Sequence, residues 1–263
     1  MCHVAAGCLS QGHNVLYITL EMAEEKIAER IDANLLNVTL DELHTIGKDD
    51  YRRKFDIVKN KTHGKLIIKE YPTASASSLH FRALLNELAL KKNFRPDIIF
   101  IDYLNICSSA RIKPGGNVNS YTYIKSIAEE LRGLAVENNL PIVSATQTTR
   151  SGYTNSDPGL EDTSESFGLP ATADFMFALV TNEELENLNQ ILVKQLKNRY
   201  NDPSSYKRFV VGIDRAKMKL YDVEESAQRD LADSGQDDIP DRPLNTFGNR
   251  ERKMNDKFDG LKI

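Results

Sequence analysis

The chain contains the stretch Ile98-Ile99-Phe100-Ile101-Asp102-Tyr103-Leu104, in which an apolar run is followed directly by a carboxylate. Pro96 precedes the run and a polar loop follows it, a pattern that predicts a central parallel strand covered on both faces. Ligands of open α/β sheets bind beyond the carboxyl ends of such strands, so Asp102 would lie where the magnesium ion of a nucleotide could be held. Many buried strands end in Asp without any chemistry, so the stretch alone leaves both interpretations open.

Composition limits the class of protein. The 263 residues are enough for one large α/β domain with a tail or for two small domains. A formal net charge of −4 argues against a protein that coats nucleic acid through bulk positive charge, so nucleic-acid contact would be confined to particular loops. The 3 scattered cysteines form no C-x-x-C pair and fit a reducing cytoplasm. No apolar run approaches the roughly 20 residues that span a bilayer, and a secretion signal is lacking, so we expect a soluble, intracellular protein.

The first two thirds of the chain alternates predicted strands and helices. Strands are expected at 14–20, 66–68, 98–102 and 141–145. Helices are expected at 23–36 and 121–136, and a further helix begins at Ser77 or Ser78. The helix before the Asp102 strand carries its buried stripe at Phe81, Leu84, Leu85 and Leu88. Strand, helix, strand in repetition predicts an α/β fold with a mostly parallel sheet flanked by helices.

The two ends of the chain differ from this pattern. After Asp174, strands are expected at 175–180, 190–196, 209–213 and 219–223 without long helices between them, and the turn at 200–204 predicts a C-terminal β-hairpin region. Residues 225–263 carry few apolar side chains and mixed charge, which predicts a disordered tail after a domain spanning 1–224. Residues 1–11 have the composition of the end of a helix that Gly12 closes, without a cap or a strand before it.

Polar side chains follow three of the predicted strands: Glu21, Asp102 and Gln147. A nucleotide-hydrolysing site needs a base that orients water, a carboxylate for the metal shell and a polar group that senses the terminal phosphate. Each residue has a plainer interpretation. Glu21 could begin the next helix, where a carboxylate favours the dipole, and Gln147 could hydrogen-bond a strand end.

The order of the motifs resembles that of the RecA-like ATPase domain of DnaB-type replicative helicases, with the greatest similarity to those of T-even-like bacteriophages. The segments that carry the resemblance are Tyr17-Ile18-Thr19-Leu20-Glu21-Met22, Ile99-Phe100-Ile101-Asp102-Tyr103-Leu104, Ser144-Ala145-Thr146-Gln147 and Lys197-Asn198-Arg199-Tyr200. Supporting stretches are 12–18, 120–122, 127–132 and 168–175, so the resemblance covers roughly residues 1 to 224.

The resemblance implies a role for each matching residue. Glu21 would polarise the attacking water, Asp102 would hold Mg²⁺ through its water shell, and Gln147 would couple the terminal phosphate of ATP to the DNA-binding loops. Lys197 and Arg199 would reach the phosphates of the neighbouring subunit and stabilise charge in the transition state. As isolated residues, these two would be ordinary solvated charges beside a turn.

The resemblance also implies partners. Two loops, at about 111–119 and 150–168, would grip single-stranded DNA in the channel of a homo-hexameric ring, and they contain Arg111, Lys113, Asn117, Arg150 and Gly168. Without the resemblance, the first of these loops would be only a flexible connection. Primase and a helicase loader would be further partners, and the site of action would be the replication fork in the cytoplasm of a bacterial host.

The sequence departs from the family at the phosphate-binding loop. No G-x-x-x-x-G-K-[ST] occurs, because Gly47-Lys48 and Gly64-Lys65 lack both the earlier glycine and the following Ser or Thr. In the family this loop comes immediately before the helix that we expect at 1–11, so we expect the chain to be N-terminally truncated relative to the family, with the loop and the N-terminal domain absent. The product of a split gene with a separate N-terminal fragment, a truncated gene product and an incomplete sequence all remain open.

Two expectations follow from the absence of the loop. ATP and Mg²⁺ would bind only in the complete enzyme, and the chain alone would have negligible ATPase, because the loop supplies most of the phosphate cradle. The isolated chain would be partly disordered or prone to aggregate, because a strand that normally lies in the middle of the sheet is lost.

The sequence therefore predicts part of a phage replicative helicase that couples ATP hydrolysis to movement along single-stranded DNA and to duplex unwinding. Two alternatives remain. A RecA-type recombinase would use the same carboxylate positions with different DNA loops, and a non-catalytic remnant would only bind a helicase subunit or single-stranded DNA.

Overall fold

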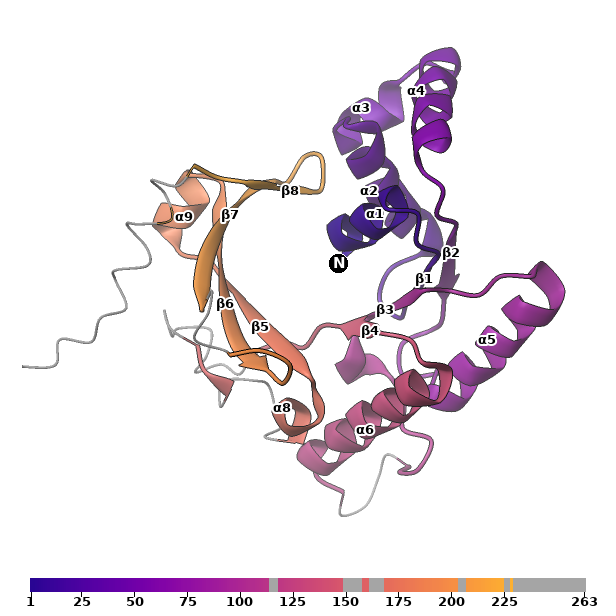
Figure 1. Cartoon of the computed structure of the whole chain (residues 1–263), viewed down its shortest axis with the longest axis vertical. Helices are drawn as coiled ribbons and strands as arrows, with labels where there is room; N and C mark the ends of the chain where they lie inside the picture. The colour runs from indigo at the N-terminus through magenta and orange to yellow at the C-terminus, as the bar shows by residue number, and fades with distance from the viewer. Residues whose placement is uncertain (114–117, 149–157, 161–167, 203–206, 225–227, 229–263) are drawn as a thin grey trace, which may run out of the picture.

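A parallel sheet of four strands forms the centre of the first half of the chain (Figure 1). In this computed structural model, the described residues are 1–113, 118–148, 158–160, 168–202, 207–224 and 228. The strand order is β2 (Leu66–Glu70), β1 (Val15–Thr19), β3 (Ile98–Asp102) and β4 (Ile142–Ser144). Every neighbouring pair is parallel, which confirms the predicted parallel sheet.

Helices cover both faces of this sheet. On one face, α1 (Cys2–Ser10) and α2 (Glu24–Leu36) pack against Val15, Tyr17 and Phe100. On the other face, α5 (Ser78–Lys92) and α6 (Ser120–Asn138) pack against the side chains that alternate with these along the strands. β1 is buried at all five positions, as a strand covered on both faces must be. The predicted stripe of Phe81, Leu84, Leu85 and Leu88 is buried, which confirms the orientation of α5.

The helical segment between α2 and β2 extends beyond the sheet. It consists of α3 (Leu40–Thr45), which a Thr39–Glu42 capping box begins, and α4 (Lys48–Lys61). Figure 1 shows both helices at the top of the molecule, next to α2. The helix α1 ends where the sequence predicts. Gly12 follows it with a φ of 91°, a conformation that glycine adopts without strain.

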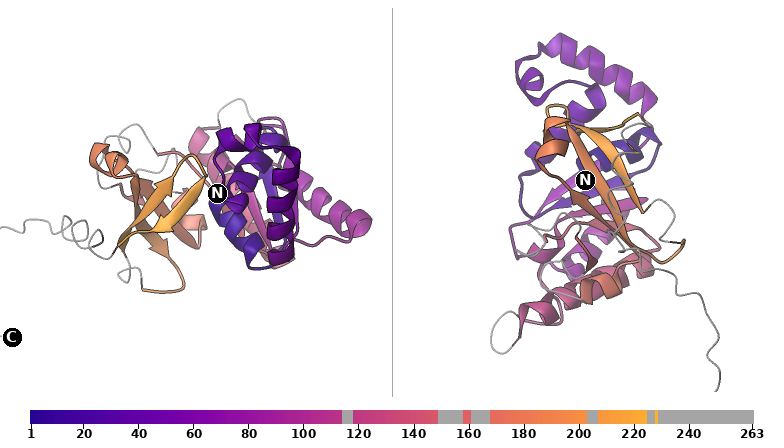
Figure 2. Two further views of the ribbon diagram at one scale, coloured as in Figure 1. Left: turned by 90° about the horizontal axis from the view of Figure 1, so that it is seen from above. Right: turned by 90° about the vertical axis from the view of Figure 1, so that its left-hand side faces the viewer.

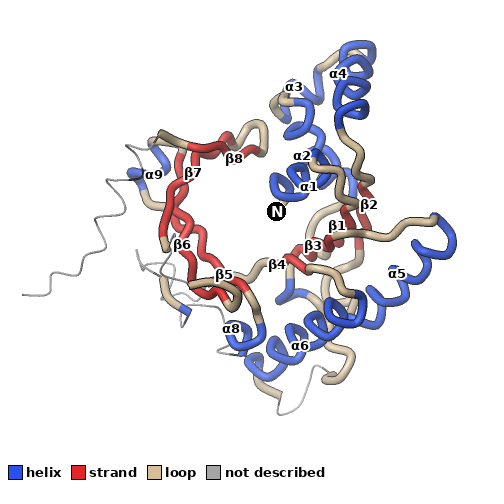
Figure 3. Tube along the Cα trace, in the orientation of Figure 1, coloured by secondary structure: helices blue, strands red, loops and turns tan. Residues whose placement is uncertain are grey.

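A second, antiparallel sheet follows the parallel one along the chain, and the two sheets are shown in red in Figure 3. Its order is β5 (Phe175–Val180), β6 (Gln190–Asn198), β7 (Arg208–Asp214) and β8 (Lys219–Asp222). The four strands agree with the four that were predicted. The predicted hairpin region is thus a complete four-stranded sheet, because β5 and β8 add to the two sides of the β6–β7 hairpin.

Figure 2 shows the second sheet beside the parallel sheet and its helices, and described contacts between the two parts occur at α8 (Gly168–Thr172) and at the turn between β7 and β8. At the first, α8 places the buried Leu169 in the same apolar cluster as α6. At the other, the turn between β7 and β8 meets α2 and α3, since Asn34 Nδ2 donates to the Met218 carbonyl (2.5 Å) and the Leu40 amide donates to the Ala216 carbonyl (3.0 Å).

Several short elements lie where the sequence predicted no helix. They are the 3₁₀ helix η1 (Leu104–Ile106), α8 and α9 (Glu183–Asn187), each too short to show an apolar period. The expected tail, 225–263, lies outside the described residues except for Gln228, whose side-chain amide bonds both the N–H and the C=O of Val210. The division at residue 224 stays a prediction.

Candidate functional site

The carboxyl edge of the parallel sheet brings three of the predicted residues close together in the fold. Asp102 ends β3, Glu21 follows β1 by two residues and Gln147 follows β4 by three. The Leu20 amide donates to the Asp102 carbonyl (2.8 Å), and Gln147 Nε2 donates to the Tyr103 hydroxyl (3.2 Å). Three neighbouring parallel strands therefore deliver two carboxylates and one amide to a single edge.

Asp102 has a buried partner that the sequence did not reveal. The Tyr17 hydroxyl donates to Asp102 Oδ2 (2.9 Å), while its ring stacks on Phe100 at 5.9 Å between centroids. Burial raises the pKa of Tyr17, and the neighbouring Cys2 and Asp102 raise it further, so the phenol stays protonated and keeps donating. Tyr17 pairs with Phe100, two residues before Asp102, and therefore shares a face with it. Strand register is the signal that could have found this contact.

Glu21 is exposed, and no described residue bonds its carboxylate. The turn that presents it is held by Thr19, whose hydroxyl accepts from the Met22 amide (3.1 Å) and donates to the Met22 carbonyl (2.8 Å). α2 begins after its N-cap Ala23, and Glu24 and Glu25 occupy its first turn. Glu21 thus lies before the positions that the helix dipole favours, which argues against the interpretation of Glu21 as a helix start.

The edge also holds an unsatisfied polar atom. Thr146 Oγ1, next to Gln147, is buried and has no hydrogen-bond partner among the described residues. A buried hydroxyl without a partner costs about 1–3 kcal/mol, so a polar ligand or water at this edge would be stabilised by it.

The residues present fit Mg²⁺ and ATP only in part. Carboxylates at 21 and 102 are suited to hold a hydrated magnesium ion, although no group of three candidate metal ligands occurs in the described part of the chain. The 263 residues contain no phosphate-binding loop, and two carboxylates without it repel a triphosphate. By themselves these residues do not fit ATP.

Lys197 and Arg199 lie at the end of β6, and both bind α8. Lys197 Nζ donates to the carbonyls of Pro170 (2.5 Å) and Ala171 (3.2 Å). Arg199 donates to the Ala171 carbonyl (3.2 Å) and to Asp174 (2.9 Å). Burial lowers the pKa of Lys197, and the nearby Arg199 lowers it further.

Asp174 joins this pair to the rest of the fold. Its second carboxylate oxygen pairs with Arg132 of α6, so one carboxylate lies between two guanidinium groups. The side chains of Lys197 and Arg199 are therefore fixed by hydrogen bonds and an ion pair within the fold, in contrast to the interpretation of them as solvated charges. Among described residues, they contact α8 and Asp174 and make no contact with Glu21 or Asp102.

The predicted DNA-binding residues have different surroundings. Lys113 is exposed, and Arg111 pairs with Glu129 at 2.7 Å. Gly168 is the buried first residue of α8, where an added Cβ would lie 2.7 Å from the Lys125 side chain, so the close approach of α6 explains a glycine there. Asn117 and Arg150 lie outside the described residues.

The start of the Arg111 segment depends on Glu130 of α6, which the sequence did not single out. Its carboxylate accepts from Ser109 Oγ (2.6 Å), the Ala110 amide (2.8 Å) and Ser78 Oγ (2.9 Å). Burial alone would raise the pKa of Glu130, but these hydrogen bonds outweigh it and hold the pKa below its usual range.

Glu130→Gln is therefore expected to lower the free energy of unfolding at pH 7 by about 1–3 kcal/mol. A pKa that is lower in the folded state stabilises the fold above the unfolded value of about 4.3 and loses this effect as the pH falls below it. Urea unfolding between pH 7 and pH 3 should show the difference between wild type and variant shrinking in the acid range. Glu137→Gln, which removes an exposed ion pair with Arg82, is the control and should change stability by less than about 1 kcal/mol. A difference that stays constant with pH would contradict the charged hydrogen-bonding role.

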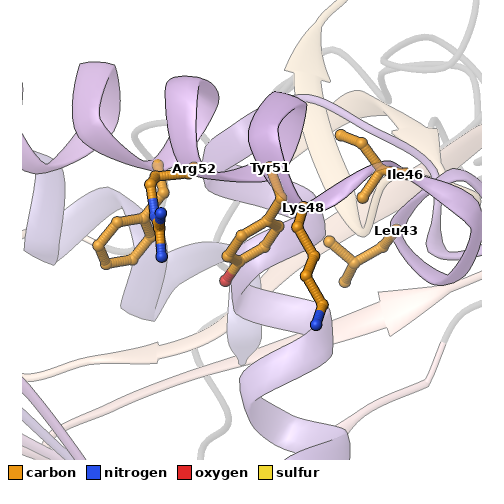
Figure 4. A pocket seen from close by; sticks show the side chains of 6 residues that line it. Leu43, Ile46, Lys48, Tyr51 and Arg52 are labelled. Atoms are coloured by element: carbon orange, nitrogen blue, oxygen red, sulfur yellow. The ribbon is translucent and has the colours of Figure 1, made fainter.

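An open pocket of about 340 Å³ lies elsewhere, between α3 and α4 (Figure 4). Its lining residues are Leu43, Ile46, Lys48, Tyr51, Arg52 and Phe55. Tyr51 also donates to Asp32 Oδ2 (3.1 Å), which ties α4 to α2. None of the predicted site residues lines this pocket.

The chain matches the family "DnaB-like helicase C terminal domain" over residues 1–207. It belongs to this family. The DnaB-like replicative helicase of Enterobacteria phage T4 is 47% identical over 230 residues, which are 86% of this chain and 48% of that protein. The chain thus spans about half the length of this relative.

Solved structures agree with the DnaB-like fold. A DnaB-like replicative helicase, solved in a study of its interactions with primase, has a TM-score of 0.67 at 18% identity, covering 85% of this chain and 54% of its own. A second solved structure, of an ATPase domain, has the same TM-score and identity and covers 84% of this chain and 78% of its own. The RecA-like α/β fold is thereby confirmed. The family is the helicase family that the motifs predicted, and the recombinase alternative is not supported. The described residues contain no helix that is long and apolar enough to cross a membrane.

Proposed function

We propose that this chain forms part of the ATPase domain of a phage replicative DNA helicase. The observation that carries the proposal is the convergence of Glu21, Asp102 and Gln147 at one edge of a parallel sheet in a DnaB-like chain. In the assembled enzyme, ATP hydrolysis would drive movement along single-stranded DNA and unwinding of the duplex at the replication fork, in the cytoplasm of the bacterial host.

Each residue at the edge has a distinct task in this proposal. Glu21, exposed and unbonded by described residues, orients and polarises the attacking water. Asp102, which Tyr17 fixes through Oδ2, would hold the hydrated magnesium ion. Gln147, bonded to Tyr103, links the terminal phosphate to the DNA-binding loops. When bound, magnesium supplies neutralisation of phosphate charge.

Lys197 and Arg199 serve the nucleotide of a neighbouring subunit. Their contacts with α8 and Asp174, away from Glu21 and Asp102, support a role outside their own subunit's site. This role requires a ring of subunits, for which we propose the hexamer of the family. Primase and a helicase loader are proposed as further partners, and the solved relative whose interactions with primase were studied supports the first of these.

The phosphate-binding groups must come from another polypeptide or segment, because these 263 residues do not contain the loop. Two of the four edge strands in the described part of the chain support this proposal, because they are consecutive along the chain. Among described residues, β4 and β5 each pair on one side only, and β5 exposes Phe175 (50%), Phe177 (46%) and Leu179 (58%). The exposed side chains lie on one face of β5, and the unpaired backbone groups of an edge strand are a template for an added strand. Such a strand, with its loop, would complete the nucleotide site.

The test is to mix the chain with a fragment of a DnaB-like helicase that carries G-x-x-x-x-G-K-[ST] and to titrate a fluorescent ATP analogue with and without Mg²⁺. We expect negligible binding by the chain alone and magnesium-dependent binding by the mixture. Tight binding by the isolated chain would refute the requirement for a second piece. If the mixture assembles but neither binds nor hydrolyses ATP, the chain is the non-catalytic remnant that only associates with a helicase subunit or with DNA.

A further inference from the structure

Glu130 is a mostly buried carboxylate outside the nucleotide edge. Its side chain is 7% exposed, and it lies on α6 where this helix meets the start of α5 and residue Ala110. A buried charge of this kind is tolerated only when hydrogen bonds replace the lost water, and here they do. Besides Ser109, Ala110 and Ser78, the Ser126 hydroxyl donates to it at 3.2 Å.

The donors tie three segments to one point. Ser78 begins α5, Ser126 lies one turn earlier on α6, and Ser109 and Ala110 begin the basic segment that follows η1. Ser109 Oγ in turn accepts from the amides of Arg111 (3.1 Å) and Ile112 (3.0 Å). The backbone amides of residues 110–112 therefore bond to Glu130 or to the Ser109 hydroxyl, which fixes the conformation and position of this backbone segment.

The two cations of the segment differ in what they contact. The Arg111 guanidinium is engaged by Glu129 (2.7 Å), the Ser126 carbonyl (3.0 Å) and Glu130 (3.5 Å). Lys113 is exposed, and no described residue contacts its ammonium group. To bind a phosphate, Arg111 would have to break its ion pairs with two carboxylates, whereas Lys113 would lose only bound water.

We propose that Glu130 is a positioning residue for single-stranded nucleic acid: it fixes residues 109–112, holds Arg111 as an anchor and leaves Lys113 to contact a backbone phosphate. This inference rests on the proposed function, because it assumes that the segment meets DNA. It separates two residues, Arg111 and Lys113, that the sequence alone assigns to the same task.

The charge change makes Glu130→Gln a sharp test. Removing a negative charge beside a phosphate-binding segment should, by Coulomb attraction alone, strengthen binding of DNA. Loss of positioning should weaken it. The two explanations therefore differ in sign, and a structural change without a role in DNA binding would leave the affinity unchanged.

The experiment is fluorescence anisotropy of an oligodeoxythymidylate with the full 263-residue chain at several salt concentrations. We expect Glu130→Gln and Arg111→Gln to weaken binding several-fold with an unchanged slope of log K against log salt. Lys113→Gln should reduce the magnitude of that slope by about 0.7, the value for one phosphate contact on a single strand. Lys91→Gln, an exposed lysine of α5 that pairs with Glu87, is the charge-matched control and should change neither the slope nor the affinity substantially.

Three outcomes would overturn the proposal. Arg111→Gln could reduce the slope as Lys113→Gln does, Glu130→Gln could leave binding unchanged or tighten it, or hydrogen exchange at the Ala110 and Arg111 amides could be as slow in Glu130→Gln as in wild type. Failure of the proposed function gives a different result: wild type shows no salt-dependent binding while these amides still exchange faster in Glu130→Gln. In that case Glu130 anchors the segment but has no role in DNA binding.

Discussion

Glu21→Gln is expected to reduce ATP hydrolysis by the reconstituted mixture about 10²- to 10⁴-fold, the usual contribution of a positioned general base. Glutamine keeps the size of the side chain but removes the charge that would polarise the attacking water. Asp102 and its Tyr17 contact are untouched, so Mg²⁺-dependent binding of the fluorescent ATP analogue should be retained. Phosphate release and nucleotide binding, measured on the same mixture, separate the two effects.

Glu25→Gln is the matched control. Glu25 is also an exposed glutamate, four residues further along the chain, but it lies in the first turn of α2. Its replacement should leave hydrolysis within about twofold of wild type, because a first-turn carboxylate contributes only about 0.3–1 kcal/mol to the helix. Equal losses of ATP hydrolysis in both variants would mean that the site needs negative charge nearby but no particular carboxylate. A wild-type rate of hydrolysis in Glu21→Gln would mean that Glu21 is not the general base.

The strands and long helices were predictable because their apolar periods are strong and local. β1 and β3 read as continuous apolar runs, and they are buried on both faces. The positions of Glu21, Asp102 and Gln147 followed directly, since parallel strands deliver their ends to one edge. Family resemblance added the roles, which the fold alone does not assign.

The contacts of the site depend on information that a single sequence does not contain. Tyr17 reaches Asp102 only because β1 and β3 pair in one particular register, and Asp174 reaches both Arg132 and Arg199 only because β6, α6 and α8 converge. Glu130 was equally hidden, because its place on the amphipathic helix α6 does not distinguish it from the helix's other glutamates, Glu129 and Glu137. Its partners Ser78 and Ser109 lie 52 and 21 residues away in sequence. Local pattern predicts which face a side chain occupies, but not which distant residue meets it there.

Leu88→Ala is expected to destabilise the fold by about 2–5 kcal/mol, because it opens a cavity where α5 packs on the parallel sheet. Leu88 is 4% exposed and belongs to the cluster that includes Phe81, Ile99 and Ile101. Leu90, two residues further along the same helix, is 86% exposed. Leu90→Ala should therefore change stability by less than about 0.5 kcal/mol.

Chemical unfolding of the two variants, compared with wild type, measures the difference directly, because helix propensity changes identically in both. A large difference in the free energy of unfolding between the two variants would show that α5 packs on the sheet through the face that contains Leu88. Equal effects would mean that the helix does not pack in this orientation. A transition too broad to yield a free energy would instead support the expectation that the chain alone is incompletely ordered. The same pair of variants, measured with the loop-bearing fragment, would then show whether the added strand restores cooperative unfolding. If it does, Leu88→Ala should again lower the free energy of unfolding relative to Leu90→Ala.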